Sequence, residues 1–145
     1  MEGYPPALAR DLAARAVDVL TRDSRVRLVY LFGSAVDSAS PVARDVDLAV
    51  WTEPRLTVED LVQLRAQLVD VVHTRIDLIS LNDAPIVLAK EVADHGLCLY
   101  AASDDVETEF VVRARARFWD FAPFLKTQWK LAGLRIEERL RGSAT

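Results

Sequence analysis

Residues 28–50 read LVYLFGSAVDSASPVARDVDLAV, and the predicted fold depends on them. It begins with an apolar run, turns at Gly33, and ends in a second apolar run whose start carries Asp45 and Asp47. Near-continuous apolar runs of this length are typical of strands covered on both faces. Because successive strand side chains point to opposite faces, the two acids share one face, about 6–7 Å apart along the chain. The stretch therefore predicts two strands, the second of which carries a pair of carboxylates.

The residues around the turn are suited to phosphate and metal. Gly33 ends the first strand, where a glycine lets the backbone turn with φ > 0 or approach a ligand closely. If a short helical turn follows, its free N–H groups and the Ser34 hydroxyl can point at a phosphate. Two carboxylates held side by side repel each other unless a cation lies between them. Since Mg²⁺ prefers carboxylate and phosphate oxygens, the stretch predicts a pocket for a Mg²⁺–triphosphate.

A third acid, Asp77, interrupts the later apolar run that predicts a strand at 75–81. An unpaired carboxylate would be costly if it were buried there. One interpretation is a salt bridge to Arg75 or to another arginine. The other is that Asp77 stands on the same face as Asp45 and Asp47, on a neighbouring strand, and completes a metal triad.

The composition is that of an ordinary folded protein. The 145 residues are 51% hydrophobic and 28% charged, a length that fits one domain. No run of 18 apolar residues predicts a membrane span, and the N-terminus lacks the features of a secretion signal. The single cysteine, Cys98, fits a reducing cytoplasm and is expected to be a small buried hydrophobe. The net charge of −4 argues against direct nucleic-acid binding, because Lys and Arg provide that affinity.

Apolar periodicity places the other elements. Helices are predicted at 5–22, 57–73, 82–96 and 104–140, and strands at 25–32, 45–50, 75–81 and 97–100. Thr57 is expected to cap the second helix, and the Asn82-Asp83 pair to provide an Asx cap for the third. Pro123 predicts a kink or break near Ala122. The fold class is therefore α/β, of the α+β two-layer kind.

We expect a mixed sheet of about four strands, with helices covering one face and a long C-terminal helix packed alongside. The acids would line the open face. Trp51 falls on this face too and is a candidate for stacking on the nucleotide base. The chain would form a single domain over 1–145, with a core at about 5–100 and a C-terminal helical extension at about 104–140.

The C-terminal helix carries six of the eleven aromatic residues. One set follows a helical stripe and is expected to cover the sheet: Phe110, Ala114, Phe118, Phe121 and Leu125. A second set does not wholly fit this stripe and is a candidate protein interface: Trp119, Phe124 and Trp129.

Gly33-Ser34, ten residues and Asp45-x-Asp47-Leu-Ala-Val resemble the signature of the DNA polymerase beta-type nucleotidyltransferases. Within them the chain resembles the minimal nucleotidyltransferases, small cytoplasmic proteins often paired with HEPN-domain toxins. The resemblance covers most of the chain. It implies that Asp77 completes a catalytic triad and that the three acids hold two Mg²⁺ ions.

By the same resemblance, Gly33 and Ser34 would hold the phosphates of ATP, with Arg44 available to a phosphate or to Asp45. Many relatives carry a basic residue and a glycine shortly after Gly-Ser and a serine before the first acid. This chain has Val36, Asp37 and Arg44 instead.

The function implied is that of an antitoxin that transfers AMP from ATP to a tyrosine of a HEPN ribonuclease toxin, silencing it. Two alternatives stay open. One is a catalytically weak antitoxin that binds and occludes its toxin through the aromatic C-terminal surface. The other is a small-molecule nucleotidyltransferase that modifies, for instance, an aminoglycoside hydroxyl, although those enzymes generally carry a further substrate-binding region.

Overall fold

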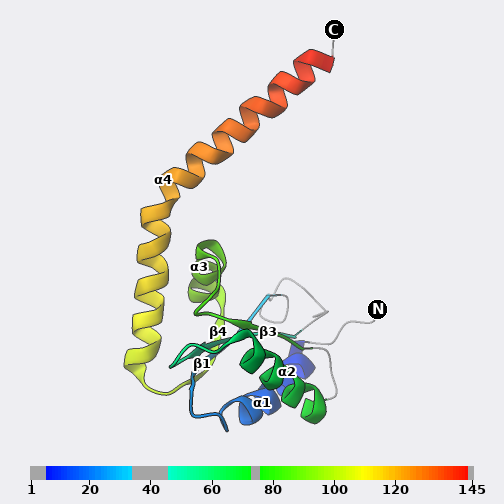
Figure 1. Cartoon of the computed structure of the whole chain (residues 1–145), viewed down its shortest axis with the longest axis vertical. Coiled ribbons are helices and arrows are strands. Elements are labelled where there is room, and N and C mark those ends of the chain that lie inside the picture. The colour runs from blue at the N-terminus through cyan, green and yellow to red at the C-terminus, as the bar shows by residue number, and fades with distance from the viewer. Residues whose placement is uncertain (1–5, 34–45, 73–75, 144–145) are drawn as a thin grey trace.

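The computed structural model describes residues 6–33, 46–72 and 76–143, which form a mixed four-stranded sheet and its surrounding helices (Figure 1). The elements are α1 (Pro6–Leu20), β1 (Val26–Phe32), β2 (Val46–Thr52), α2 (Val58–Val72), β3 (Ile76–Ser80), α3 (Ile86–His95), β4 (Leu97–Ala101) and α4 (Asp104–Ser143). All the predicted helices and strands are present, and their ends differ from the prediction by a few residues.

The sheet has the strand order β3-β2-β1-β4. Strand β1 runs antiparallel to both β2 and β4, whereas β2 and β3 are parallel. The two strands predicted from residues 28–50 are therefore the inner strands. Their burial on both faces explains why their sequences are nearly continuous apolar runs.

Helices α1 and α2 form the helical layer expected on one face of the sheet (Figure 1). Their apolar stripes pack against the strand residues that point to this side, because a sheet face of this kind must be covered to bury its apolar side chains. The resulting core includes Leu12, Ala16, Leu64, Leu68, Val29, Leu31, Val46, Leu48, Val50 and Leu78.

The opposite face was expected to be open, but α3 and the first part of α4 cover part of it. Leu28, Tyr30 and Ala49 point to this side and are buried, so this face is also apolar along β1 and β2. The Phe110 ring of α4 lies 5.5 Å from the ring of Tyr30 and 6.3 Å from that of Trp51. An inner strand that is apolar on both sides needs a helical cover on both sides.

Of the two predicted helix caps, the one at α2 is present and the one at α3 is wrong. The Thr57 hydroxyl accepts a bond from the Asp60 N–H at 3.1 Å, and the Asp60 carboxylate accepts one from the Thr57 N–H at 3.3 Å, so α2 is capped as predicted. Helix α3 has Pro85 before it and no side-chain cap. Asn82 instead pairs with the backbone of Thr52, accepting from its N–H at 3.0 Å and donating to its carbonyl at 2.9 Å.

Helix α4 is continuous from Asp104 to Ser143 and contains Pro123. Figure 1 shows that it bends in its orange part and then extends away from the rest of the molecule. Of the two predicted outcomes at Pro123, the helix therefore shows a bend and not a break. A proline inside a helix commonly produces such a kink. In the ranges that the structure describes, no helix combines the length and apolar character needed to cross a membrane.

The aromatic residues of α4 separate as their spacing predicts. Phe110 and Ala114 belong to the stripe that was expected to cover the sheet, and both are buried. Trp119, Phe124 and Trp129 are 70%, 53% and 67% exposed. The second set therefore makes little contact with the protein's own core.

Candidate active site

The site begins where the end of β1 meets the start of β2. The strand register pairs Phe32 with Asp47, which brings Gly33 beside the Asp47 side chain. Gly33 has φ of +77°, a conformation that residues with a side chain adopt at a cost. A Cβ atom at this position would also overlap Oδ2 of Asp47. The expected positive φ is confirmed, and the close approach is made to the Asp47 carboxylate.

The parallel pairing of β2 and β3 places Asp77 directly opposite Asp47. Paired residues on neighbouring strands lie about 5 Å apart and point to the same face of the sheet. Asp47 is half-buried and Asp77 is exposed, while Leu48 and Leu78 are buried on the other face. The structure therefore brings these two predicted acids together, on the face that carries α3 and α4.

Three predicted site residues, Ser34, Arg44 and Asp45, lie outside the described residues, so their roles stay predictions. Among the described residues, no three His, Cys, Asp or Glu side chains form a metal-binding group, and Asp45 is not among those residues. The salt-bridge alternative for Asp77 named Arg75, which is also outside them. No residue that the structure describes forms an ion pair with Asp77.

The two described acids fit a hard divalent cation. Their carboxylates come from adjacent strands and face the same side, which concentrates oxygen ligands and negative charge. Like charges held this close are unfavourable without a compensating cation. Asp47 and Asp77 could therefore share a Mg²⁺ ion, and Asp45 is the predicted further ligand.

Trp51 does not support the idea of a stacking platform beside the acids. It pairs with Leu28, at the other end of β2 from Asp47. Its ring packs against Phe110, and the guanidinium of Arg113 lies 5.6 Å from its centroid. Trp51 therefore helps to hold α4 on the sheet.

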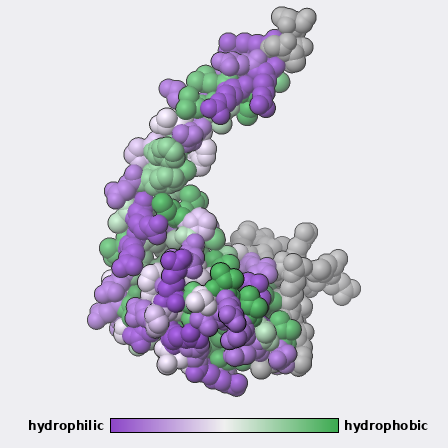
Figure 2. Space-filling model, in the orientation of Figure 1, coloured by the Kyte–Doolittle hydropathy of each residue, from purple (hydrophilic) through white to green (hydrophobic). Residues whose placement is uncertain are grey.

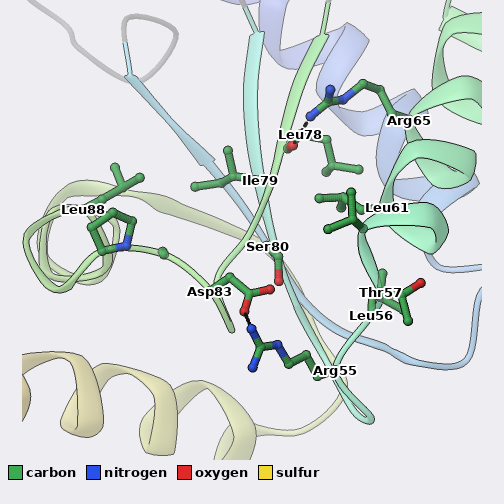
Figure 3. A pocket seen from close by; sticks show the side chains of 13 residues that line it. Arg55, Leu56, Thr57, Leu61, Arg65, Leu78, Ile79, Ser80, Asp83 and Leu88 are labelled. Atoms are coloured by element: carbon green, nitrogen blue, oxygen red, sulfur yellow. Dashed lines mark hydrogen bonds and ion pairs between the residues drawn. The ribbon is translucent and has the colours of Figure 1, made fainter.

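A cleft of about 850 Å³ lies along β3, the edge strand that carries Asp77 (Figure 3). Its walls come from α2 and α3, with Leu61 and Leu88 on opposite sides. The Arg65 guanidinium donates to the Leu78 carbonyl at 2.8 Å, and Arg55 forms an ion pair with Asp83. The sequence carried no signal for this cleft, because it arises where two helices separated along the chain flank one strand.

Cys98 lies in a half-buried position that disfavours its thiolate form. Cys98 pairs with Tyr30 in the sheet and lies near Glu107. Burial, assisted by the negative charge of Glu107, raises the pKa of the Cys98 thiol to about 11. Burial also raises the pKa of the Tyr30 hydroxyl above its usual range. The thiol is therefore protonated at neutral pH, and the side chain is half-buried where a buried one was expected.

The family model for "Polymerase beta, Nucleotidyltransferase" matches residues 15–105, more than half of the chain. The chain therefore belongs to this nucleotidyltransferase family. The matched range begins within α1 and includes all four strands of the sheet, so the acid-bearing pair of strands lies inside it.

A particular relative is the protein adenylyltransferase MntA of Shewanella oneidensis. The chain is 30% identical to it over 90 residues, which cover 61% of this chain and 65% of MntA. The match thus spans a little less than two thirds of that relative's length.

Solved structures give the same fold. A toxin–antitoxin complex with AMP-PNP contains a chain that is 23% identical, with a TM-score of 0.71 over 81% of this chain and 95% of that one. The complex of a tri-AMPylated Shewanella oneidensis HEPN toxin with an MNT antitoxin gives 23% identity and a TM-score of 0.68, covering 83% and 95%. The predicted nucleotidyltransferase fold is confirmed.

Proposed function

We propose that this chain is an antitoxin that transfers AMP from ATP to a tyrosine hydroxyl of a HEPN-domain toxin. The observation that supports the transfer most directly is the register that sets Asp77 opposite Asp47, with Gly33 against the Asp47 carboxylate. The relatives support the choice of nucleotide and acceptor, because one is a protein adenylyltransferase and another is an antitoxin in complex with a tri-AMPylated toxin.

The roles follow from position. Gly33 lets the backbone turn close to the Asp47 carboxylate, and Gly33, the Ser34 hydroxyl and Arg44 would bind the phosphates. Asp45, Asp47 and Asp77 would hold two Mg²⁺ ions. When bound, the metal ions would lower the pKa of the attacking hydroxyl and neutralise charge on the departing pyrophosphate.

In the transfer, the tyrosine oxygen forms a bond to the α-phosphorus of ATP. The bond from that phosphorus to the oxygen that bridges to the β-phosphate breaks, and pyrophosphate leaves. The tyrosine proton passes to the carboxylate of Asp77. Because Asp77 is exposed on the edge strand, the toxin tyrosine would approach from the β3 side, while Asp47 and Gly33 hold the nucleotide on the inner strands.

A second candidate is an antitoxin that acts by binding alone. The observation in its favour is the exposure of Trp119, Phe124 and Trp129 on α4, since exposed tryptophans are frequent in protein interfaces. Both candidates share the toxin as partner and differ only in whether a covalent bond forms.

The test uses the purified chain, ATP, Mg²⁺ and a HEPN-domain toxin, followed by intact mass of the toxin. We expect a mass gain that matches one or more AMP groups. The Asp47→Asn variant should give none, and the control Asp70→Asn, at an exposed position of α2, should behave as wild type. If the toxin is neutralised while its mass is unchanged, the transfer is wrong and binding alone remains.

A further inference from the structure

Helix α4 carries one apolar stripe along most of its length, but only its first half has a surface to cover. Phe110 and Ala114 are buried against the sheet and α3. The same stripe continues, at helical spacings of three and four residues, beyond the end of the core. Its later members are Leu125, Trp129, Ala132, Ile136 and Leu140.

The first half of α4 is held by specific contacts with α3. The Arg115 guanidinium forms an ion pair with Asp94 at 2.9 Å. The Lys90 ammonium lies 4.6 Å from the centroid of the Phe118 ring. These contacts orient the helix so that its apolar stripe faces the protein's own core.

The remaining part of the helix, residues 124–143, is here called the α4 arm. It extends away from the sheet, and Figure 2 shows apolar patches interleaved with polar ones along it. Within the described part of the chain, every side chain from Lys126 to Arg141 is exposed. Trp129, Ile136 and Leu140 are 67%, 57% and 65% exposed. Large apolar side chains repeated along one helix face are typical of a surface that another protein covers.

The charge of the α4 arm indicates what kind of partner fits. It contains five basic and two acidic side chains, a net charge of +3 in a chain whose overall charge is −4. At 3.6 residues per turn, Arg135 and Arg139 fall along one border of the stripe. Lys126 and Lys130 fall along the other, together with Glu137, which forms an ion pair with Arg141 at 3.6 Å. An apolar stripe with mainly basic borders is complementary to an apolar groove with acidic borders. Two copies of the arm would bring like charges together, which is unfavourable.

We propose that the α4 arm docks its stripe onto an acidic-bordered helical surface of the HEPN toxin. The inference rests on the proposed function, which supplies that partner. The 3–4 spacing suits packing against another helix. Docking at the arm would tether the toxin to the chain that carries the acids and raise the effective concentration of its tyrosine.

The test compares two double variants of the full chain with equal changes in chemistry. Trp129→Glu with Ile136→Glu places charges in the stripe. Leu131→Glu with Leu134→Glu places them at apolar positions that are 42% and 47% exposed but lie off the stripe. Binding to a HEPN-domain toxin is measured by calorimetry. We expect the stripe variant to bind about 30-fold more weakly or worse, and the control to stay within about threefold of wild type.

Enzyme kinetics give a second measurement. The stripe variant should raise the KM for the toxin and leave kcat unchanged, because the arm contributes to binding and not to the chemical step. Circular dichroism and ATP binding should match wild type in both variants, which excludes misfolding as the cause.

Three results would overturn the inference. They are wild-type affinity in the stripe variant, equal weakening in the control, and a wild-type homodimer that the stripe variant converts to a monomer, which would make a second copy the occupant. The proposed transfer fails differently, since the wild-type chain would then bind the toxin without adding mass to it.

Discussion

The acid-bearing end of the sheet and the α4 arm differ in what fixes their side chains. At the sheet, register and a glycine with positive φ determine where Asp47 and Asp77 lie. In the α4 arm, helical periodicity aligns the apolar residues, but no other element of the described chain covers them. The sheet site therefore has the fixed geometry that the proposed nucleotide site requires. The arm has the exposed apolar surface that the proposed docking requires.

This difference separates two kinds of mutational effect. Changes at the acids should affect the chemical step, and changes in the α4 arm should affect association without altering the stability of the isolated chain. Residues of α4 that pack on the sheet should do the reverse and affect stability first. Four sets of substitutions test that separation.

The largest effect should come from the two opposed acids. Asp47→Asn and Asp77→Asn should each lower kcat for the proposed AMP transfer by about three orders of magnitude, because each removes a proposed ligand for the metal ions. The double variant should be little worse than either single variant, since groups that act as a unit are not additive. Single-turnover assays with purified toxin measure this. If the fold-loss of kcat in the double variant equals the product of the two single losses, the acids act independently, which would contradict their pairing in the sheet.

The next prediction uses the two ends of the same stripe. Phe110→Ala should lower the free energy of unfolding by about 3–5 kcal/mol, because it leaves a cavity beside Tyr30 and Trp51. Trp129→Ala removes a larger side chain but should change that free energy by less than about 0.5 kcal/mol, since the residue is 67% exposed. Urea denaturation of the isolated chain gives both values. Equal losses would mean that the α4 arm is packed against its own protein in solution.

Much of the sheet site follows from the sequence. The apolar runs around residues 28–50 predict the two inner strands, and alternation along the second strand predicts the face of its acids. The position of Asp77 opposite Asp47 is consistent with a strand–helix–strand unit, in which parallel strands are connected through a crossover helix.

Other features needed the tertiary structure. Because β1 is apolar on both faces, its sequence does not tell which helix covers Leu28 and Tyr30 and which covers Val29. Asn82 has the local sequence of a helix cap, yet its amide satisfies the backbone of Thr52 on another strand. Local sequence rules predict that Asn82 caps the following helix. In the structure, its amide bonds instead to backbone groups that are distant in the sequence.

A smaller effect is expected at the glycine corner. Gly33→Ala should lower the free energy of unfolding by about 1–2 kcal/mol through the positive φ alone, and the Asp47 carboxylate must also move aside. The control is Gly133→Ala in the α4 arm, where a new Cβ would meet nothing within 4 Å. Since alanine favours a helix interior over glycine by about 1 kcal/mol, this variant should increase the helical circular dichroism signal. The corner and the arm should therefore respond in opposite directions to the same substitution. If Gly133→Ala lowers the free energy of unfolding as Gly33→Ala does, then position 133 is also constrained by contacts.

The smallest effect concerns the junction between the two regions, where Asp94 of α3 contacts Lys90 and Arg115. Hydrogen bonds from Lys90 and then from Arg115 hold the pKa of the Asp94 carboxyl below its ordinary value of 3.8. A lowered pKa in the folded state means that the contribution to stability is present at neutral pH and is lost as the pH falls below 3.8. Asp94→Asn should therefore destabilise the chain at pH 7 by less than about 1 kcal/mol, as is usual for solvent-screened ion pairs. Urea denaturation at several pH values should show the difference from wild type shrinking toward acid. A difference that persisted unchanged below pH 3.8 would mean that the asparagine disturbs the packing of α4 on α3, and not its charge contacts.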